Sequence, residues 1–474
     1  MSQTPVLVWF REDLRLSDNP ALDHAVATGA PLLLLYILDE ASPGVRPLGG
    51  ATRWWLSRSL AALSADIARK GGHLILRRGA AGPIVEDLVA QHDVRTVCWN
   101  RRYTAAGIAV DRGLKEALKA KGVGVETFNG SLLDEPWTVK TKAGEPFRVF
   151  TPYHRAAREH APPAPTRAPK ALPPGPACAS DDLDGWRLEP TRPDWAGGLR
   201  RAWTPGEAGG QTRLGDFLDV GLKGYAVKRD RPDRDNVSRL SPHLHFGEVS
   251  PRQVLAGAQL AGEDGRANSA DVAKFVAELY WREFSYHLLF HVPDLATRNF
   301  QPRFDAFPWQ DDEALLTAWQ RGRTGYPIVD AGMRQLRETG WMHNRVRMVT
   351  ASFLIKHGLV DWRRGEAWFW DTLVDADPAS NAASWQWVAG SGADAAPYFR
   401  IFNPVLQGEK FDPDGAYVRR YVPELGALPA RVIHRPWEAG AARPADYPAP
   451  VVDHAAARAR ALDAYERMRA EAGG

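Results

Sequence analysis

Short apolar runs alternate with amphipathic segments through the first 130 residues, and this alternation constrains the fold more than any other feature of the sequence. The runs are Val6–Phe10, Leu32–Leu38, 73–76, 96–99 and 123–128. Segments of helical periodicity lie between them, and the one at 51–70 ends at a pair of glycines. Strands that alternate with helices predict βαβ units on a parallel sheet. We therefore expect a doubly wound α/β domain over residues 1–130.

A change of composition separates this region from the rest of the chain. Residues 161–176 contain seven prolines, which cannot continue a helix or a central strand. We interpret residues 131–198 as a Pro-rich connector that lies over the surface. From Leu214 onward helical periodicity dominates, so residues 199–474 are expected to form an all-α domain. The helices expected there are 272–290, 313–321, 329–339, 344–357 and 365–374.

The overall composition excludes several classes of protein. Two cysteines cannot build a disulfide framework or a four-cysteine iron–sulfur or zinc site. No spacing of His, Asp and Glu is typical of a metal site, so no metal is expected. No apolar run approaches the roughly 18 residues of a membrane helix, and no signal segment begins the chain. These observations predict a monomer in the reducing cytoplasm, without membrane contact.

Charge and short motifs narrow the choice further. The net charge of +3 is too small to indicate nucleic-acid binding by itself, but arginines cluster at 229–239 and 334–347. Single surface charges are usually solvated. Because these clusters lie beside aromatic motifs, we interpret them as phosphate contacts. No G-x-G-x-x-G follows the first strand, so the α/β domain is not expected to hold a nicotinamide or flavin in the Rossmann manner.

Tryptophan is concentrated in the second half of the chain. Nine of the 18 tryptophans lie from Trp281 to Trp387, interleaved with carboxylates, Asn and Arg. A helical core needs aliphatic side chains more than indoles, whereas an indole can lose an electron. The concentration therefore suggests a redox cofactor that receives electrons through the protein.

Four long motifs identify a family that this chain resembles. They lie at 6–22 (VLVWFREDLRLSDNPAL), 238–253 (SRLSPHLHFGEVSPRQ), 278–290 (ELYWREFSYHLLF) and 324–404. They closely resemble the photolyase/cryptochrome family, in particular bacterial photolyases that repair cyclobutane pyrimidine dimers. The resemblance implies that the helical domain holds FAD, and that excited reduced flavin donates an electron to a dimer in damaged DNA.

The resemblance also implies which residues bind FAD. The segment 238–241 is expected at the phosphates and ribityl chain, and Asn381 at flavin N5, where an amide can donate or accept a hydrogen bond. Val237 departs from the family, whose members often have Thr there. The expected cofactor-binding residues are Tyr225, Val237, Ser238, Arg239, Leu240, Ser241, Arg282, Asn344, Arg347, Asp375, Ala376, Asp377 and Asn381.

Three tryptophans match the electron-transfer chain of the family. From the flavin to the surface these are Trp385, Trp362 and Trp309, and their expected role is photoreduction of oxidised flavin. Any one of them alone would more often be a core aromatic residue. Further indoles at Trp341, Trp368, Trp370 and Trp387 leave an alternative path open.

The motif E-x-x-W-R-E marks the expected substrate site. Glu278 and Trp281 share a helix face, and the indole offers a surface for a flipped base worth about 1–3 kcal/mol. The alternative is a buried helix with a Glu278–Arg282 ion pair. The expected DNA-binding residues are Arg229, Glu278, Trp281, Asn344, Arg345, Met348, Trp387 and Arg400, and the expected catalytic residues are Trp309, Trp362, Trp385, Asn381 and Glu278.

Two relatives with other activities remain as alternatives, and the antenna chromophore is open. A cryptochrome photoreceptor is the first alternative. A (6-4) photolyase is disfavoured because Asn344 follows His343 where such relatives typically carry a second histidine. The segment 100–107 contains no carboxylate, whereas many relatives use a glutamate shortly after the W-N-x-x-Y segment for folate. We expect methenyltetrahydrofolate as the antenna, with 8-hydroxy-5-deazaflavin as the alternative.

Overall fold

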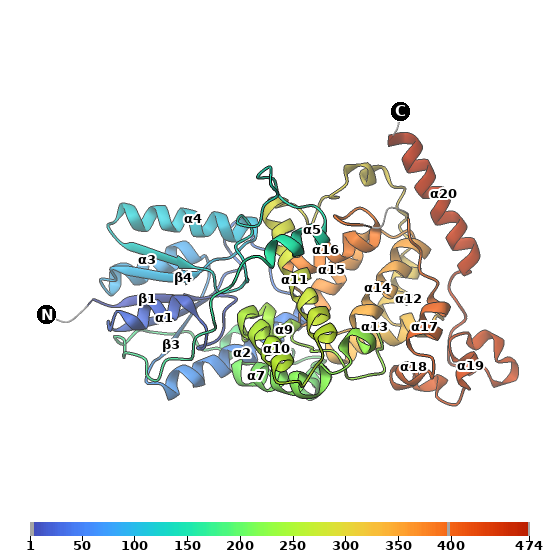
Figure 1. Ribbon diagram of the computed structural model, residues 1–474, viewed down its shortest axis with the longest axis horizontal. Coiled ribbons are helices and arrows are strands. Elements are labelled where there is room, and N and C mark those ends of the chain that lie inside the picture. The colour runs from blue at the N-terminus through green and yellow to red at the C-terminus, as the bar shows by residue number, and fades with distance from the viewer. Residues whose placement is uncertain (1–3, 396–398, 473–474) are drawn as a thin grey trace.

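The computed structural model describes residues 4–395 and 399–472. An α/β part and a helical part lie next to each other along the long axis of the molecule (Figure 1). The chain begins at the far end of the α/β part, and α20 (His454–Ala472) runs along the opposite end.

The α/β part is built on a five-stranded parallel sheet of order β3-β2-β1-β4-β5. The strands are β1 (Val6–Phe10), β2 (Leu32–Leu38), β3 (Leu74–Arg78), β4 (Thr96–Asn100) and β5 (Gly124–Phe128). Val6 of β1 is in register with Leu32 on one side and Thr96 on the other. The strand order reverses at β1, which confirms the expected doubly wound topology.

The apolar runs are continuous because helices cover both faces of this sheet. Successive side chains of a strand point to opposite faces. Val6, Val8 and Phe10 pack in one core with α1 (Pro20–Ala27) and α2 (Gly50–Arg69). Leu7 and Trp9 pack in a second core with α3 (Ala81–Gln91) and α4 (Ala105–Ala120).

The Pro-rich segment runs along the edge of the sheet. Residues 161–176 form no helix or strand, as the prolines predict. Just beyond them the N–H of Leu76 in β3 donates to Ser180 Oγ over 2.9 Å, and the Leu76 carbonyl accepts from Asp181 N over 2.9 Å. The segment therefore pairs with the outer strand and shields its backbone from other chains.

Helices make up the second part, as helical periodicity predicts. They are α6 (Gly197–Ala202), α7 (Glu207–Asp216), α8 (Tyr225–Lys228), α9 (Ser241–His245), α10 (Pro251–Glu263), α11 (Ser269–His291), α12 (Glu313–Gln320), α13 (Pro327–Thr339), α14 (Asn344–Ser352), α15 (Trp362–Thr372), α16 (Pro378–Ala389), α17 (Pro404–Phe411), α18 (Ala416–Tyr421), α19 (Ala430–Ile433) and α20. The expected single helix 344–357 is wrong in one respect, because α14 passes into a π-helical turn at Phe353–His357. Within the described ranges, no helix is both long and apolar enough to cross a bilayer.

Buried polar contacts join the two parts. Arg15, which follows β1, is fully buried and donates to the carbonyls of Gly130 (2.6 Å) and Gly247 (2.8 Å). Asp18 forms an ion pair with Arg252 of α10 over 3.0 Å. Unpaired charges in such positions would be costly, so these contacts fix the helical part against the carboxyl end of β1.

Candidate functional site

A cavity of about 570 Å³ opens in the helical part between α8, α9, α11, α14 and α16. Most of the residues predicted to bind cofactor or substrate line it. These are Tyr225, Arg229, Val237, Ser238, Arg239, Leu240, Ser241, Glu278, Trp281, Arg282, Asn344, Arg345, Arg347, Met348, Asp375, Asp377, Asn381, Trp385 and Trp387. Segments from Tyr225 to Trp387 therefore converge on one hollow of a size typical of ligand sites.

Four predicted residues lie outside the cavity wall. Ala376 is buried behind it, between two residues that do line it. Trp309 and Trp362 belong to the same apolar cluster as Trp385 but do not line the cavity. Arg400 is exposed, with its guanidinium 5.0 Å from the ring centroid of Phe402.

An arginine–aspartate pair forms part of the cavity wall. Arg347 of α14 donates to both carboxylate oxygens of Asp375, over 2.8 and 3.1 Å, and its Nε donates to the carbonyl of Met342 over 2.7 Å. Asp375 is 6 % exposed. The contacts hold the guanidinium plane in one orientation beside the cavity.

Asp377 begins α16 and stays ionised. Its carboxylate accepts from the backbone N–H groups of Ala379 (3.0 Å) and Ser380 (2.6 Å), which caps the helix. It also accepts from the hydroxyl of Tyr286 over 2.6 Å. Burial alone would raise the pKa of Asp377, but His245, Arg282 and the helix N–H groups lower this pKa well below its usual range. The site therefore keeps a fixed negative charge.

The Asn381 amide has a defined orientation. Its Nδ2 donates to the side chain of Glu366 over 2.8 Å and to the Glu366 carbonyl over 3.1 Å. Glu366 is in turn held by two hydrogen bonds from Arg46, of 2.8 and 2.9 Å, from the other part of the molecule. The guanidinium of Arg46 lies 4.0 Å from the ring centroid of Trp370. Because Nδ2 is engaged, the amide presents its oxygen, a hydrogen-bond acceptor, to the cavity.

The segment before α9 brings hydroxyl groups and a strained backbone to the cavity. Arg239 has φ of +51°, a left-handed conformation that is uncommon for a residue with a side chain. Its guanidinium lies 5.2 Å from the ring centroid of Trp341, whose indole N–H donates to Ser241 Oγ over 3.4 Å. This end of the cavity therefore offers hydroxyls and a cation together.

Trp281 has one face covered by the protein. Phe150 of α5 (Phe150–Ala157) stacks on the indole, with ring centroids 3.7 Å apart and an interplanar angle of 8°. Trp281 lines the cavity and is half-buried. Phe150 lies in the expected connector, and nothing in its sequence pattern indicated this contact.

Carboxylates already pair with the cations at the cavity mouth. Glu278 forms ion pairs with Arg229 and with Lys274 (3.0 Å), and the predicted alternative pair with Arg282 does not form. Arg345 forms an ion pair with Asp230 over 2.9 Å. The mouth therefore combines positive and negative side chains.

The three predicted tryptophans differ in exposure. Trp385 lines the cavity and packs edge-on against Phe369, with centroids 5.0 Å apart. Trp362 is fully buried, and its indole N–H donates to Asn299 over 3.0 Å. Trp309 is half-buried and packs on Phe307, with centroids 4.4 Å apart. All three belong to one apolar cluster.

Two buried residues near the site have roles that contacts explain. His343 is buried and caps α14 by accepting from Arg345 N over 3.2 Å. Burial lowers the pKa of His343 to about 4, so it is neutral at pH 7. Glu283 accepts from the N–H of Leu133 over 2.8 Å, and burial raises its pKa to about 8. In the described part of the chain, no cluster of three His, Cys, Asp or Glu side chains suits a metal ion.

Fold and cavity together define a class: a two-domain protein with a doubly wound α/β domain and a helical, cofactor-binding domain. Residues 6–173 match the DNA photolyase model, and residues 275–467 match the FAD binding domain of DNA photolyase. The chain belongs to the DNA photolyase family, and its helical domain is an FAD-binding domain.

Individual relatives agree with this assignment. The chain is 53% identical to a deoxyribodipyrimidine photo-lyase of Agrobacterium fabrum, over 99% of each chain. It is 38% identical to cryptochrome-1 of Arabidopsis thaliana, over 98% of this chain and 70% of that protein. The crystal structure of a bacterial class III photolyase from Agrobacterium tumefaciens superposes with a TM-score of 0.95 at 53% identity, covering 99% of this chain and 98% of that one.

Proposed function

We propose that this protein uses light to split cyclobutane pyrimidine dimers in DNA, as a deoxyribodipyrimidine photo-lyase. One observation carries the proposal. A single cavity brings two sets of groups together. The first set is the oriented Asn381 amide, the Arg347–Asp375 pair and the Trp385 indole, which suit a flavin. The second set is the Trp281 indole and the Met348 thioether, which suit an unstacked pair of bases.

Asp375, Arg347 and Asn381 are proposed to hold the flavin ring, and 238–241 with Tyr225 the phosphates and ribityl chain. The residues fit the group, because the Asn381 oxygen faces the cavity as an acceptor and the 238–241 end offers hydroxyls. When bound and reduced, FAD supplies light absorption and the transfer of one electron to and from the dimer. Val237 would contribute backbone contacts only. Ala376, behind the wall, would act by positioning its neighbours.

Recognition of the lesion is proposed to rest on stacking and on shape. Trp281, supported from behind by Phe150, offers its free face to a base. Met348 gives a polarizable apolar contact, and Glu278 accepts hydrogen bonds at the same mouth. Asn344 and Trp387 also line the wall there. A dimer is extruded at lower cost than intact bases, which gives selectivity without sequence readout.

Arginines at the mouth are proposed to hold the DNA backbone. Arg229 and Arg345 would exchange carboxylate partners for phosphates, whose oxygens accept hydrogen bonds from guanidinium groups. Arg400 is exposed and free to reach a phosphate outside the cavity. Backbone contacts position the duplex without reading its sequence.

The tryptophans are proposed to reduce oxidised flavin before repair. Trp385 lines the cavity, Trp362 is fully buried and Trp309 is half-buried, and all three belong to one apolar cluster, which supports this role. Electrons would enter at Trp309 and leave from Trp385. Repair itself then depends on Glu278, Trp281 and Asn381 and not on this chain of indoles.

The domain limits 1–130, 131–198 and 199–474, a monomeric state and a cytoplasmic location are part of the same proposal. A second chromophore is also proposed, methenyltetrahydrofolate or, as the alternative, 8-hydroxy-5-deazaflavin. The family relation supports an antenna in the α/β domain. Release of the bound small molecules by denaturation, followed by mass spectrometry, identifies the chromophore.

A repair assay tests the main proposal. The purified, flavin-loaded protein is reduced, mixed with a duplex that contains one thymine dimer, and illuminated with blue light. We expect restored thymines in the light and none in the dark, with a (6-4) photoproduct left unchanged. Light-induced flavin reduction without dimer repair would instead support a cryptochrome, to which the 38% identity with cryptochrome-1 already points as the second candidate.

A further inference from the structure

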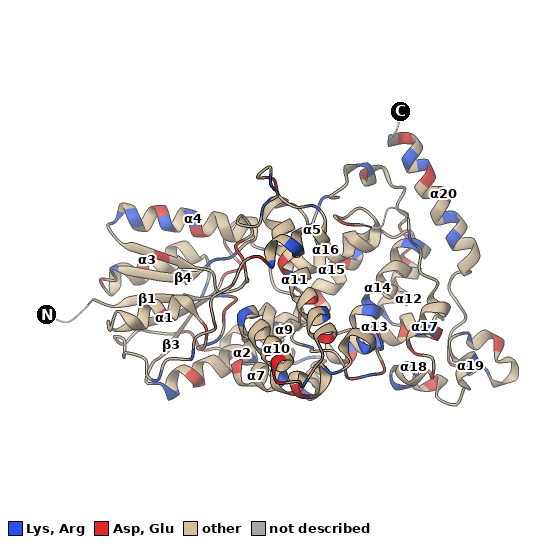
Figure 2. Ribbon diagram, viewed as in Figure 1, with Lys and Arg blue, Asp and Glu red and all other residues tan. Residues whose placement is uncertain are grey.

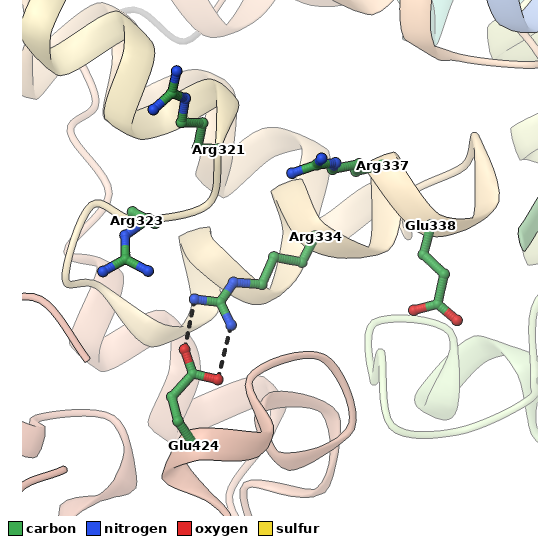
Figure 3. Close-up of a pocket in the computed structure, with 6 residues that line it drawn as sticks. All are labelled: Arg321, Arg323, Arg334, Arg337, Glu338 and Glu424. Atoms are coloured by element: carbon green, nitrogen blue, oxygen red, sulfur yellow. Dashed lines mark hydrogen bonds and ion pairs between the residues drawn. The ribbon is translucent and has the colours of Figure 1, made fainter. Parts of the chain in front are cut away.

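A second hollow, of about 510 Å³, lies outside the flavin cavity, where α12, α13 and the segment after α18 meet (Figure 3). Its lining residues are Arg321, Arg323, Arg334, Arg337, Glu338 and Glu424. Four arginines against two glutamates give the lining a net charge of +2. In Figure 2, which colours Lys and Arg blue, both α13 and α14 carry blue segments.

The arginines of this hollow differ in their partners. Arg334 is bound by Glu424 over 2.7 and 2.9 Å and donates to the carbonyl of Gly322 over 3.0 Å, so it supports the fold. Arg321 and Arg337 are exposed and form no ion pair within the ranges that the structure describes. Arg323 is exposed too and makes one 3.4 Å bond, to a carbonyl. Three guanidiniums are thus free to take a ligand.

The lining selects the chemistry of that ligand. All six lining residues are charged, and none is an aromatic residue on which a base would stack; the apolar part of the lining comes from the aliphatic stems of these side chains. Guanidinium groups bind phosphate oxygens through paired hydrogen bonds. A site with an excess of cations and no aromatic side chain recognises phosphate charge and not a stacked base.

The hollow is close to the mouth of the flavin cavity along the chain. Arg337 on α13 and Asn344 on α14 are seven residues apart, and such a segment spans at most about 25 Å. A DNA strand advances about 3.4 Å per nucleotide. Arg337 of the hollow therefore lies within the length of about seven nucleotides from Asn344 on the cavity wall.

We propose that Arg321, Arg323 and Arg337 form a second phosphate site, which holds the DNA backbone away from the lesion. The inference rests on the proposed function, which supplies the DNA. A contact at this hollow should raise the affinity for a long duplex and not for a short strand, whether or not a lesion is present. Free phosphate or pyrophosphate shares the chemistry and is the competing source.

The test combines R321Q, R323Q and R337Q in one variant of the full-length, flavin-loaded protein. Arg334 is left intact because its ion pair supports the fold. Two ligands are titrated at several salt concentrations: a dimer-containing single strand of six nucleotides, and a dimer-containing duplex that extends twelve base pairs to each side. The short ligand reaches only the flavin cavity. A control variant removes the same charge from α4 by R112Q, K115Q and K119Q, far from the hollow (Figure 1).

We expect the triple variant to bind the short ligand as the wild type does and to bind the long duplex at least fivefold more weakly. Its slope of log K against log salt should be less steep by about 1–3, since each lost phosphate contact contributes about 0.9. An undamaged long duplex should lose affinity by the same factor. Wild-type binding of the short dimer strand reports on the proposed function separately, so its failure is distinguishable from failure of the second site.

Four results would overturn the proposal. These are unchanged binding of the long duplex, an equal loss with the short ligand, an equal loss in the α4 control, and a thermal stabilisation by pyrophosphate that the triple variant loses while its duplex binding stays normal. The last result would assign the hollow to free phosphate.

Discussion

Replacement of Trp281 by Ala tests the proposal that stacking reads the lesion. The change removes the indole face at the cavity, worth about 1–3 kcal/mol for one stacked base. That corresponds to a loss of roughly 5- to 150-fold in affinity for dimer-containing DNA. Affinity for undamaged duplex should hardly change. The structure adds a second effect, because the stack on Phe150 at 3.7 Å is also lost and reduces stability by about 0.5–1.5 kcal/mol.

Phe150→Leu separates the two effects of this substitution. It removes the same intramolecular stack but keeps the indole at the cavity, so stability should fall while lesion preference is largely retained. Fluorescence anisotropy with damaged and undamaged duplexes measures preference, and chemical denaturation followed by circular dichroism measures stability. If Trp281→Ala kept the wild-type lesion preference in a folded, flavin-loaded protein, Trp281 would be a packing residue and the stacking argument would fail.

Three further predictions concern the electron path, the oriented amide and pH. Trp385→Phe should abolish photoreduction of oxidised flavin, because a phenyl ring is harder to oxidise, while chemically reduced protein still repairs dimers in a light assay. Glu366→Gln weakens the Arg46 contacts and lets the Asn381 amide turn. We expect the unfolding free energy to fall by at most roughly 1–3 kcal/mol, because the Arg46 side chain is 37% exposed and solvent weakens its ion pair. We also expect a shifted flavin midpoint potential, measured by spectroelectrochemistry. Glu283 binds a proton in the folded state up to its raised pKa of about 8, whereas the unfolded chain releases it near 4.5. The wild-type unfolding free energy should therefore fall with rising pH between these values, by up to about 1.4 kcal/mol per unit, and Glu283→Gln should remove this component.

Each of these predictions has a contrary result. Wild-type photoreduction in Trp385→Phe would assign the first transfer to another indole. An unchanged midpoint potential in Glu366→Gln, with stability reduced, would mean that the bridge is purely structural. The same pH dependence in Glu283→Gln and wild type, measured by urea denaturation across pH 5 to 9, would show that Glu283 is ionised throughout.

The sequence predicts the elements of this fold better than the contacts between them. Alternation of apolar runs identified all five strands, since a parallel sheet covered on both faces needs continuous apolar residues. The turn at Phe353–His357 was missed because α- and π-helical periodicities differ little over five residues. A resemblance located the cavity residues, which short spacings alone did not connect.

Contacts between distant segments had no local signal. Arg46 and Glu366 are 320 residues apart, and neither stands in a pattern that indicates its partner. Phe150 lies in a connector whose composition indicated only a surface path. Such pairs are set by how the two parts dock, which depends on the whole of both surfaces.

The ion pairs at the cavity mouth have a consequence for the search along the genome. Arg229 and Arg345 are paired with Glu278 and Asp230, so under the proposed backbone contacts a passing duplex must displace a carboxylate to gain each phosphate. Intact sites vastly outnumber damaged ones, so a protein that bound every phosphate tightly would remain mostly on intact DNA. This competition between carboxylates and phosphates shortens the time for which the protein stays bound to intact DNA. Contacts with an extruded dimer then lengthen the time for which it stays bound to damaged DNA.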